Sequence, residues 1–333
     1  MRRSAHILGA GGIGIAVAEG LIHAGWQVTL VESSPAKLEA ARRDGMTLEG
    51  RPTRRPLVQD FQSWQPPADM PVLLCTKTFD NPAVLERLHS VERLVPVQNG
   101  YDPLLERQSH PTEAIASFVS MCPADRPVAR ITRPGDLHIG PRRPCRAAAA
   151  AHLDDLASGL AQGGLFRVHR VDSVRPFKAT KLMYNAAISP LAAAAGVDNA
   201  VLITEPLARR LFFALLKENH RILRHAGERL ERIGPFHPDT VMRILATPLL
   251  PRLLAVFFRP SLRGTYCSMR PDMGSGRTEV DAYNGHLIRL AGSTPAPINR
   301  AVLEMEARIS AQRLAPSHKH LVSLAACLPR GTA

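Results

Sequence analysis

The first half of the chain alternates short apolar runs with stretches of helical periodicity. Continuous apolar runs of strand length occupy residues 5–8, 28–31, 71–76 and 94–98, and further strand patterns occupy 114–121 and 129–139, the latter with a turn at Pro134-Gly135. Between them lie helical stretches such as 82–92. A chain that alternates strands and helices in this way typically folds into a mainly parallel sheet covered by helices. We therefore expect an α/β fold for this half.

The pattern changes near residue 172. Beyond it the strand signals stop, and long helical patterns follow one another at 173–196, 205–232, 237–258, 277–291 and 299–313. At 333 residues the chain is long enough for two domains, each with its own core. We predict a sheet domain over residues 1–172 and an all-helical domain over residues 173–333.

A glycine-rich turn separates the first expected strand from the first expected helix. It reads Gly9-Ala10-Gly11-Gly12-Ile13-Gly14, which is a G-x-G-x-x-G pattern. In such a turn Gly9 permits the tight bend, Gly11 lets the backbone approach a pyrophosphate and Gly14 lets the helix pack on the strand, while Gly12 lies in the same turn. The pyrophosphate then lies at the positive end of the helix. The turn predicts a Rossmann-type dinucleotide-binding domain, and the alternative is a glycine-rich joint without a ligand.

Glu32 ends the second expected strand, 18 residues after the last glycine of the turn. A carboxylate at this place accepts hydrogen bonds from a ribose diol and repels a 2′-phosphate. Taken alone, Glu32 favours NAD(H) over NADP(H). Two alternatives stay open: the carboxylate points to solvent, or Lys37 or Arg42 neutralises it.

Composition narrows the classes of partner. The net charge is +13, but the basic residues are scattered, aromatic residues make up only 5%, and no known nucleic-acid module occurs. The charge therefore indicates small anionic ligands, not a nucleic acid. No apolar run is long enough to span a bilayer. Because the five cysteines are dispersed without metal-ligand spacing, we expect a cytoplasmic protein without a bound metal or a membrane segment.

Lysine is rare among the basic residues. Of the 42, 36 are Arg and six are Lys. An ammonium can be tuned to release its proton near neutral pH and a guanidinium cannot, so a retained Lys is a candidate for proton chemistry, although the six can also be incidental. Lys181 shares a helix face with Asn185 and Ser189, because residues four apart lie above one another. The apolar flanking sequence favours a functional stripe over a solvated face.

Further polar residues occupy places where ligands bind. Lys77 and Asn99 each come just after an expected strand, at the strand ends that hold ligands in such folds, and we expect both to contact the cofactor. In the helical half, Ser268 and Glu279 lie in a polar segment, and we expect Glu279 in the first turn of a helix capped by Thr278. The alternative is an ordinary capped helix with an acid favoured by the helix dipole.

Taken together, these segments resemble the ketopantoate reductases, the family of 2-dehydropantoate 2-reductases. The resemblance rests on residues 9–14, 75–77, 98–100, 181–191, 268–285 and 297–300, in this order. It implies a Rossmann domain that binds NADPH and a helical domain that closes over it. It also implies roles for six side chains: a general acid at Lys181, substrate-orienting groups at Glu279, Asn99 and Asn185, a substrate contact at Ser268 and a cofactor contact at Lys77.

Several positions depart from the family pattern. Ser189 stands where the family often has Asn, Ala192 where it often has Thr, and the spacing from Asp272 to Glu279 is one residue shorter. These three departures leave the exact 2-oxo acid open. Glu32 stands where the family often has a basic residue that binds the 2′-phosphate, which leaves open whether the cofactor is NADP(H) or NAD(H).

We expect an oxidoreductase that transfers a hydride from NAD(P)H to a small anionic 2-oxo acid. Lys181 is the expected proton donor, and Ser189 and Ser268 are expected substrate contacts. The alternatives are a reductase of another keto or imine substrate and a dinucleotide-sensing protein without catalysis. The combination of Lys181, Asn185 and Glu279 argues against a sensor, which needs no proton donor. The oligomeric state stays open, with a homodimer among the forms considered.

Overall fold

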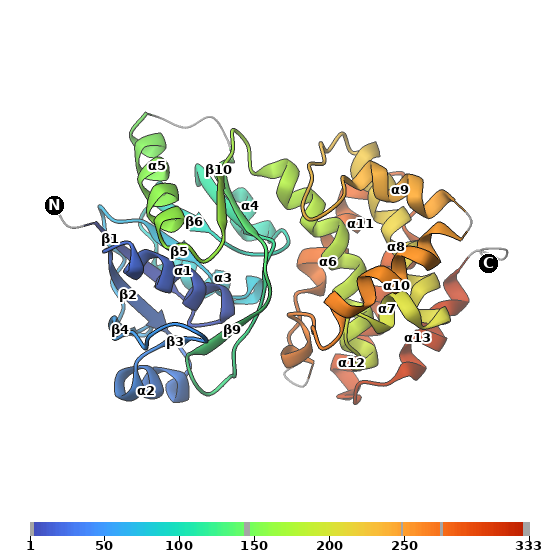
Figure 1. The fold of residues 1–333 in the computed structure, drawn as a ribbon, viewed down its shortest axis with the longest axis horizontal. Helices are drawn as coiled ribbons and strands as arrows, with labels where there is room; N and C mark the ends of the chain where they lie inside the picture. Colours follow the sequence, from blue (N-terminus) through green and yellow to red (C-terminus); the bar gives the residue numbers. More distant parts are fainter. Residues whose placement is uncertain (1–2, 143–146, 248, 274–275, 329–333) are drawn as a thin grey trace. The chain divides into compact units, whose positions relative to one another are not determined.

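The computed structural model describes residues 3–142, 147–247, 249–273 and 276–328 (Figure 1). The chain divides into two compact units. We call residues 1–98 with 103–175 the sheet unit, and residues 99–102 with 176–333 the helical unit. The short segment 99–102 therefore packs with the helical unit although its neighbours in sequence belong to the sheet unit.

The centre of the sheet unit is a five-stranded parallel sheet in the order β4-β2-β1-β5-β6. Its strands are β1 (Ser4–Leu8), β2 (Gln27–Glu32), β4 (Leu57–Asp60), β5 (Val72–Leu74) and β6 (Leu94–Pro96). The strands nearest the centre are buried and apolar, as expected for a parallel sheet covered on both faces. The strand order reverses between β1 and β5, and ligands of such sheets bind at the carboxyl ends of the strands beside that point. The predicted α/β fold is confirmed.

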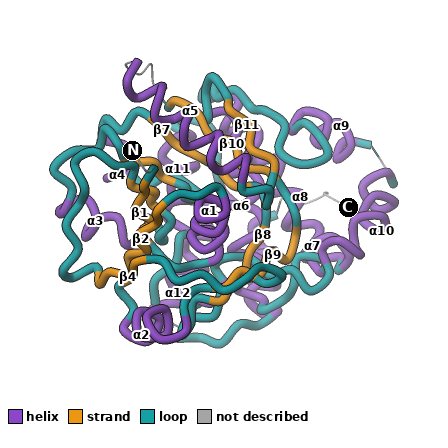
Figure 2. The backbone as a smooth tube through the Cα atoms, turned by 60° about the vertical axis from the view of Figure 1, so that its left-hand side comes forward, coloured by secondary structure: helices purple, strands orange, loops and turns teal. Residues whose placement is uncertain are grey.

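Helices and short turns surround this sheet (Figure 2). They are α1 (Gly12–His23), α2 (Pro35–Asp44), the 3-10 turn η1 (Thr78–Asp80), α3 (Asn81–Arg87), α4 (Pro103–Arg107) and α5 (Ala147–Gln162). Buried side chains of α1 and α5 share one core with β1 and β2, and Trp64 fills a second core on Leu8 and Val31.

Two small sheets complete the sheet unit, and they correct one expectation. One contains β3 (Thr47–Leu48), β9 (Val128–Arg133) and β8 (Val119–Met121), and the other contains β11 (Arg167–Arg170), β10 (Asp136–Pro141) and β7 (Thr112–Ala116). The single strand expected over 114–121 is wrong, because this region is split between the two sheets as β7 and β8. The turn expected at Pro134-Gly135 lies between β9 and β10, which also belong to different sheets. Both segments pass from one small sheet to the other near Ser117 and Asp136. There the backbone and hydroxyl of Ser117 exchange hydrogen bonds with the Asp136 backbone.

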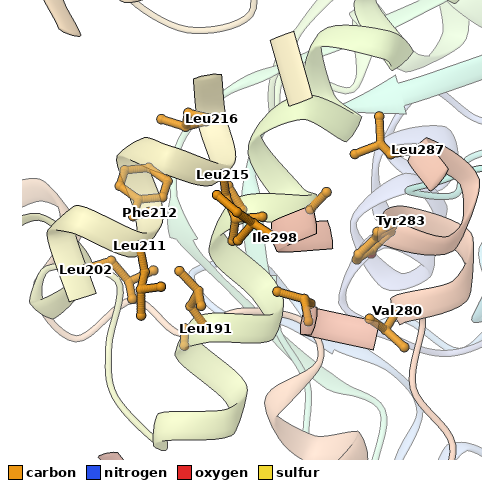
Figure 3. Packing of buried hydrophobic residues seen from close by; sticks show 14 of the residues in the cluster. Leu191, Leu202, Leu211, Phe212, Leu215, Leu216, Val280, Tyr283, Leu287 and Ile298 are labelled. Carbon is orange, nitrogen blue, oxygen red and sulfur yellow. The ribbon is translucent and has the colours of Figure 1, made fainter. Parts of the chain in front are cut away.

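The helical unit surrounds one large apolar core to which α6, α8 and α12 contribute (Figure 3). Its helices are α6 (Arg175–Ala195), α7 (Val201–Thr204), α8 (Pro206–His225), α9 (Pro238–Ala246), α10 (Leu250–Leu262), α11 (His286–Ala291), α12 (Pro297–Gln312) and α13 (His318–Leu324). Shorter turns are η2 (Arg270–Asp272), the π-helical η3 (Asp281–Gly285) and η4 (Ala325–Cys327). In the described part of the chain, none of the helices has the length and hydropathy of a membrane-spanning segment.

Two of the expected long helices are wrong in extent. The helix expected over 205–232 ends at His225, since Gly227 adopts a φ of 77° that stops it. The helix expected over 237–258 is two helices, because Thr247 has extended backbone (φ −92°, ψ 127°), as residues before a proline favour. The proline itself, Pro248, lies outside the described residues.

Candidate functional site

The glycine turn after β1 leaves room for a ligand at one position only. Gly9 has a φ of 93°, and a Cβ placed on it comes within 3.0 Å of the Thr76 side chain. A Cβ on Gly14 would overlap the carbonyl oxygen of Gly9, so this residue lets α1 pack on the turn. A Cβ on Gly11, by contrast, meets no atom within 4 Å. The fold itself thus requires Gly9 and Gly14, while Gly11 borders open space.

The amino end of α1 faces the same turn. Gly11 is the N-cap, it makes no side-chain capping bond, and the first turn of the helix carries no acid. Such a helix end favours an anion through its N–H groups and its dipole. A Cβ on Gly12 would overlap the hydroxyl of Ser120, which places this β8 residue beside the helix end. The place of Ser120 beside the glycine turn could not be predicted from the sequence, because no motif links this residue to the turn.

Glu32 is buried and bonded to backbone. Its Oε2 accepts from the Ala10 N–H at 2.9 Å, and its Oε1 accepts from Ser33 N–H at 2.8 Å and Ser34 N–H at 2.9 Å. Only 8% of the residue is exposed, so the alternative that it points to solvent is wrong. Lys37, which could have neutralised it, hydrogen-bonds the thiol of Cys122. The carboxylate therefore stabilises the glycine turn and stays beside it.

The strand ends next to β1 are cross-linked by amides. Gln98 Nε2 donates to the carbonyl oxygen of Thr76 at 2.9 Å and to Asn81 Oδ1 at 2.8 Å, and Asn81 Nδ2 donates back to Gln98 Oε1 at 3.1 Å. Lys77 follows Thr76 and caps the start of η1. These bonds fix the loop that carries Lys77 at the carboxyl end of β5.

In the helical unit, Tyr283 connects two of the predicted site residues. Its hydroxyl donates to Glu279 Oε2 at 3.2 Å, and the side chain of Ser268 hydrogen-bonds the same hydroxyl. Burial, and then the nearby Glu279 carboxylate, raise the pKa of Tyr283 well above its ordinary value, so the phenol keeps its proton. Glu279 is 4% exposed. The helical segment that contains η3 begins at Val280. Glu279 therefore lies one residue before this segment, and its expected place in the first turn is wrong by one residue.

Asn99 reaches this cluster through the backbone. Gly100 has a φ of 75°, and a Cβ on it would approach within 2.6 Å of the Tyr283 ring. The next residue, Tyr101, donates its backbone N–H to the Ala282 carbonyl at 2.9 Å. The Oδ1 atom of Asn99 is buried and has no hydrogen-bond partner among the residues that the structure describes. A buried acceptor of this kind is expected to bond a ligand.

The helix α6 carries Lys181 and Asn185, both half-buried, and Ser189, which is buried. Pro190 lies inside this helix and has no N–H for the carbonyl of Ala186. Asn284 supplies the missing donor, since its Nδ2 donates to Ala186 O at 2.9 Å. The Cys267 thiol also donates to the Ser189 carbonyl at 3.4 Å. The segments of Ser268 and Glu279 are thus both joined to α6.

A buried amide network supports this arrangement from behind. Asn284 Nδ2 also donates to Asn299 Oδ1 at 2.8 Å, and Asn299 Nδ2 donates to Glu218 Oε1 and Asn219 Oδ1, each at 2.8 Å. Asn219 Nδ2 donates to the Met183 carbonyl of α6 at 3.0 Å. Asn284 lies in the π-helical turn η3, a distortion that frequently marks functional sites. The network was missed because its members lie up to 98 residues apart.

The structure therefore distributes the predicted residues over two places. Ser268 and Glu279 meet at the Tyr283 hydroxyl in the helical unit, and Asn99 directly precedes Gly100, which packs on the Tyr283 ring. Lys181, Asn185 and Ser189 lie on α6, the helix that Asn284 and Cys267 join to these segments. The sheet unit carries the rest, namely Gly9, Gly11, Gly12, Gly14, Glu32 and Lys77. Among the described residues, no three His, Cys, Asp or Glu side chains are grouped to hold a metal.

Comparisons with known proteins found two matching family models. The family model described as ketopantoate reductase PanE/ApbA matches residues 5–144, and the model of its C-terminal part matches residues 173–309. A 2-dehydropantoate 2-reductase of Pyrobaculum aerophilum is 23% identical over 243 residues, which are 70% of this chain and 74% of that protein.

Two solved structures share the fold. A PanE/ApbA family ketopantoate reductase from Ralstonia eutropha JMP134 has a TM-score of 0.72 at 22% identity and covers 93% of this chain and 99% of its own. A D-mandelate dehydrogenase in complex with NADH and anilino(oxo)acetate has a TM-score of 0.69 at 17% identity, covering 96% of this chain and 99% of its own.

Proposed function

Because this chain belongs to the ketopantoate reductase family, it is an oxidoreductase that reduces a 2-oxo acid with NAD(P)H, and we propose that its substrate resembles 2-dehydropantoate. The observation that carries the proposal is the buried Glu279 carboxylate, held by Tyr283 beside Ser268 and joined through Asn284 to the helix of Lys181. A proton donor, a carboxylate and several amides on one framework suit a small molecule with both a ketone and hydroxyl or carboxylate groups.

In this proposal Lys181 protonates the ketone oxygen as it gains negative charge. Asn99 and Asn185 orient the ketone, Ser268 and Ser189 contact the substrate, and Glu279 accepts a hydrogen bond from the substrate or from Lys181. Residues 173–333, together with the segment 99–102, form the substrate domain, and the rest of residues 1–172 forms the nucleotide domain.

The glycine turn fits a dinucleotide, because Gly11 borders open space and the end of α1 favours an anion. Gly11, Gly12 and the N–H groups of α1 would hold the pyrophosphate, Gly9 and Gly14 shape the turn, and Lys77 contacts the nucleotide. When bound, the reduced nicotinamide supplies the hydride. We propose NADH as the preferred form, since the Glu32 carboxylate is fixed by three backbone N–H groups and would repel a 2′-phosphate.

The test of the reaction is cofactor oxidation with a panel of 2-oxo acids and an imine. The substitution Lys181→Ala is expected to lower turnover by about 10²–10⁴-fold, the usual effect of losing a general acid, with little change in nucleotide affinity. Lys217→Ala, at an exposed lysine of α8, is the matched control. Near-normal turnover of Lys181→Ala would overturn the assignment, and a wild type that binds nucleotide but reduces no substrate would favour a sensor.

The test of the cofactor is kcat/KM for NADH and for NADPH. Glu32→Gln keeps an acceptor for the turn and removes the charge, so it is expected to improve the use of NADPH relative to NADH by about tenfold. Glu39→Gln, on the exposed side of α2, should leave the ratio unchanged. A wild type that strongly prefers NADPH would contradict the role given to Glu32.

We also propose a cytoplasmic homodimer. The free thiols of Cys75, Cys122, Cys267 and Cys327 suit a reducing compartment.

On α10 and its cap, Leu249, Leu253, Val256 and Phe257 are 65% to 75% exposed at helical spacing, a patch typical of an interface. Replacing both Leu253 and Phe257 by Asp should lower the mass measured by light scattering, whereas Val322→Asp, 55% exposed on α13, should not. A monomeric wild type would overturn the dimer.

A further inference from the structure

Tyr101 anchors the segment that carries Asn99. Its ring is buried, with 6% of the residue exposed, and the ring of His286 stacks on it with centroids 4.4 Å apart and planes 11° apart. Its backbone N–H donates to Ala282 O. The anchor therefore joins the segment 99–102 both to the turn η3 and to the start of α11.

Lys178 completes this anchor. Its ammonium lies 4.6 Å from the centroid of the Tyr101 ring, and only 2% of the residue is exposed. Lys178 lies on α6, three residues before Lys181. An ammonium is costly to bury unless the protein compensates it, and the face of an aromatic ring supplies part of that compensation. Retaining Lys here, in a chain with 36 Arg and six Lys, suggests a specific role for this side chain.

We propose that Lys178 is a positioning residue for Asn99 and acts through Tyr101. The Oδ1 atom of Asn99 has no hydrogen-bond partner within the described residues, so no protein bond to this atom fixes the amide. Its place depends on the backbone of Gly100 and Tyr101, and that backbone is held where the Tyr101 ring meets Lys178 and His286. Lys178 and Lys181 both lie on α6. One helix therefore positions the proton donor Lys181 and, through Tyr101, the amide of Asn99. This inference rests on the proposed function, in which Asn99 orients the ketone.

The kinetic test uses Lys178→Met, which keeps an unbranched apolar stem and removes the charge. A cation–π contact between buried groups is worth about 1–2 kcal/mol, so kcat/KM for the 2-oxo acid should fall roughly 5–30-fold. KM should rise, while the Kd of the nucleotide should not change. Partial unfolding alone would lower kcat and leave KM unchanged. Lys178→Arg should restore part of the loss, and Lys217→Met is the control.

Two further measurements isolate the route through Tyr101. The double variant Lys178→Met with Tyr101→Leu should be no worse than Tyr101→Leu alone, whereas multiplied losses would overturn the proposal. Hydrogen exchange of the Tyr101 amide should be faster in Lys178→Met than in wild type, and an unchanged rate with an unchanged KM would also overturn it. The exchange rate does not depend on turnover. An inactive wild type would therefore overturn the proposed function. The exchange rate of the Tyr101 amide would still show whether Lys178 holds the segment that carries Asn99.

Discussion

In the sheet unit the ligand-binding turn is made of backbone, whereas in the helical unit the polar site is made of side chains that bond to other side chains and to backbone carbonyls. Glycines shape the turn after β1, and its one buried carboxylate, Glu32, bonds only backbone N–H groups. In the helical unit Tyr283, Asn284 and Asn299 bond to Glu279, Ala186 and Glu218 through their own polar groups. A turn made of backbone tolerates most side-chain changes except at its glycines, while a network of side chains can fail at any member.

The broadest expected effect is at Gly14, where one substitution should affect both the stability of the fold and nucleotide binding. In Gly14→Ala the new Cβ overlaps Gly9 O, so the turn must shift, and the protein should lose about 1–3 kcal/mol of unfolding free energy and most of its nucleotide affinity. Gly11→Ala is the matched control: its Cβ meets open space, so stability should stay normal while nucleotide affinity falls. Titration with NADH and urea unfolding measure the two quantities. Equal stability losses in both variants would contradict the different roles of the two glycines.

The second prediction concerns Asn284 in the helical unit. Asn284→Ala leaves the carbonyl of Ala186 and the Oδ1 of Asn299 without this donor, and it should lower the free energy of unfolding by about 2–4 kcal/mol. Pro190→Ala restores a backbone N–H four residues after Ala186. Adding it to Asn284→Ala should therefore recover part of the loss in urea unfolding. No recovery would mean that the proline is not the reason for the bond.

The third prediction is a loss of stability of the helical unit toward neutral pH. Glu306 on α12 is 2% exposed, neither of its oxygens has a partner, and burial raises its pKa to about 7. Because the folded chain binds this proton more tightly than the unfolded chain, the penalty is absent below about pH 4.5, grows up to pH 7 and is complete above it, at roughly 3 kcal/mol. Glu306→Gln should remove this slope, as followed by urea unfolding at a series of pH values. A slope that survives the substitution would assign it to another group.

The fourth prediction is the opposite pH response in the sheet unit. Burial, then the positive charge of His169, lower the pKa of His138 to about 4, and the two rings stack at 4.7 Å. The unfolded chain takes up this proton near pH 6.5 and the folded chain does not, so stability is complete above pH 6.5 and is lost toward pH 4, by roughly 2–3 kcal/mol. Hydrogen exchange resolved by peptide should show the sheet unit opening on acidification, and His138→Phe should reduce the effect. Protection factors, which correct for the pH dependence of the intrinsic exchange rate, would refute the prediction if they did not change with pH.

The two units also differ in how far their sequence predicts them. The turn from Gly9 to Gly14 could be predicted, because two of its glycines meet local demands: Gly9 adopts a φ of 93°, and Gly14 lies against the Gly9 carbonyl. The place of Asn284 could not, because its partner Ala186 is 98 residues away and the demand comes from a missing N–H at Pro190. From the sequence alone, Tyr283 looks like one more member of an apolar helix face. Only the fold shows that its hydroxyl bonds Glu279. In the sequence, the one indication of a role for Lys178 is that it is a lysine in a chain whose basic residues are mostly Arg.

The bonds of Glu32 have a consequence for the thermodynamics of nucleotide binding. Because this carboxylate joins the turn to the end of β2 before any ligand arrives, the turn is preorganised, and its conformational entropy is already lost when the chain folds. Binding of the nucleotide should therefore order little of the sheet unit. In calorimetry, the heat-capacity change should then match only the surface that the nucleotide itself covers, without a contribution from loop folding.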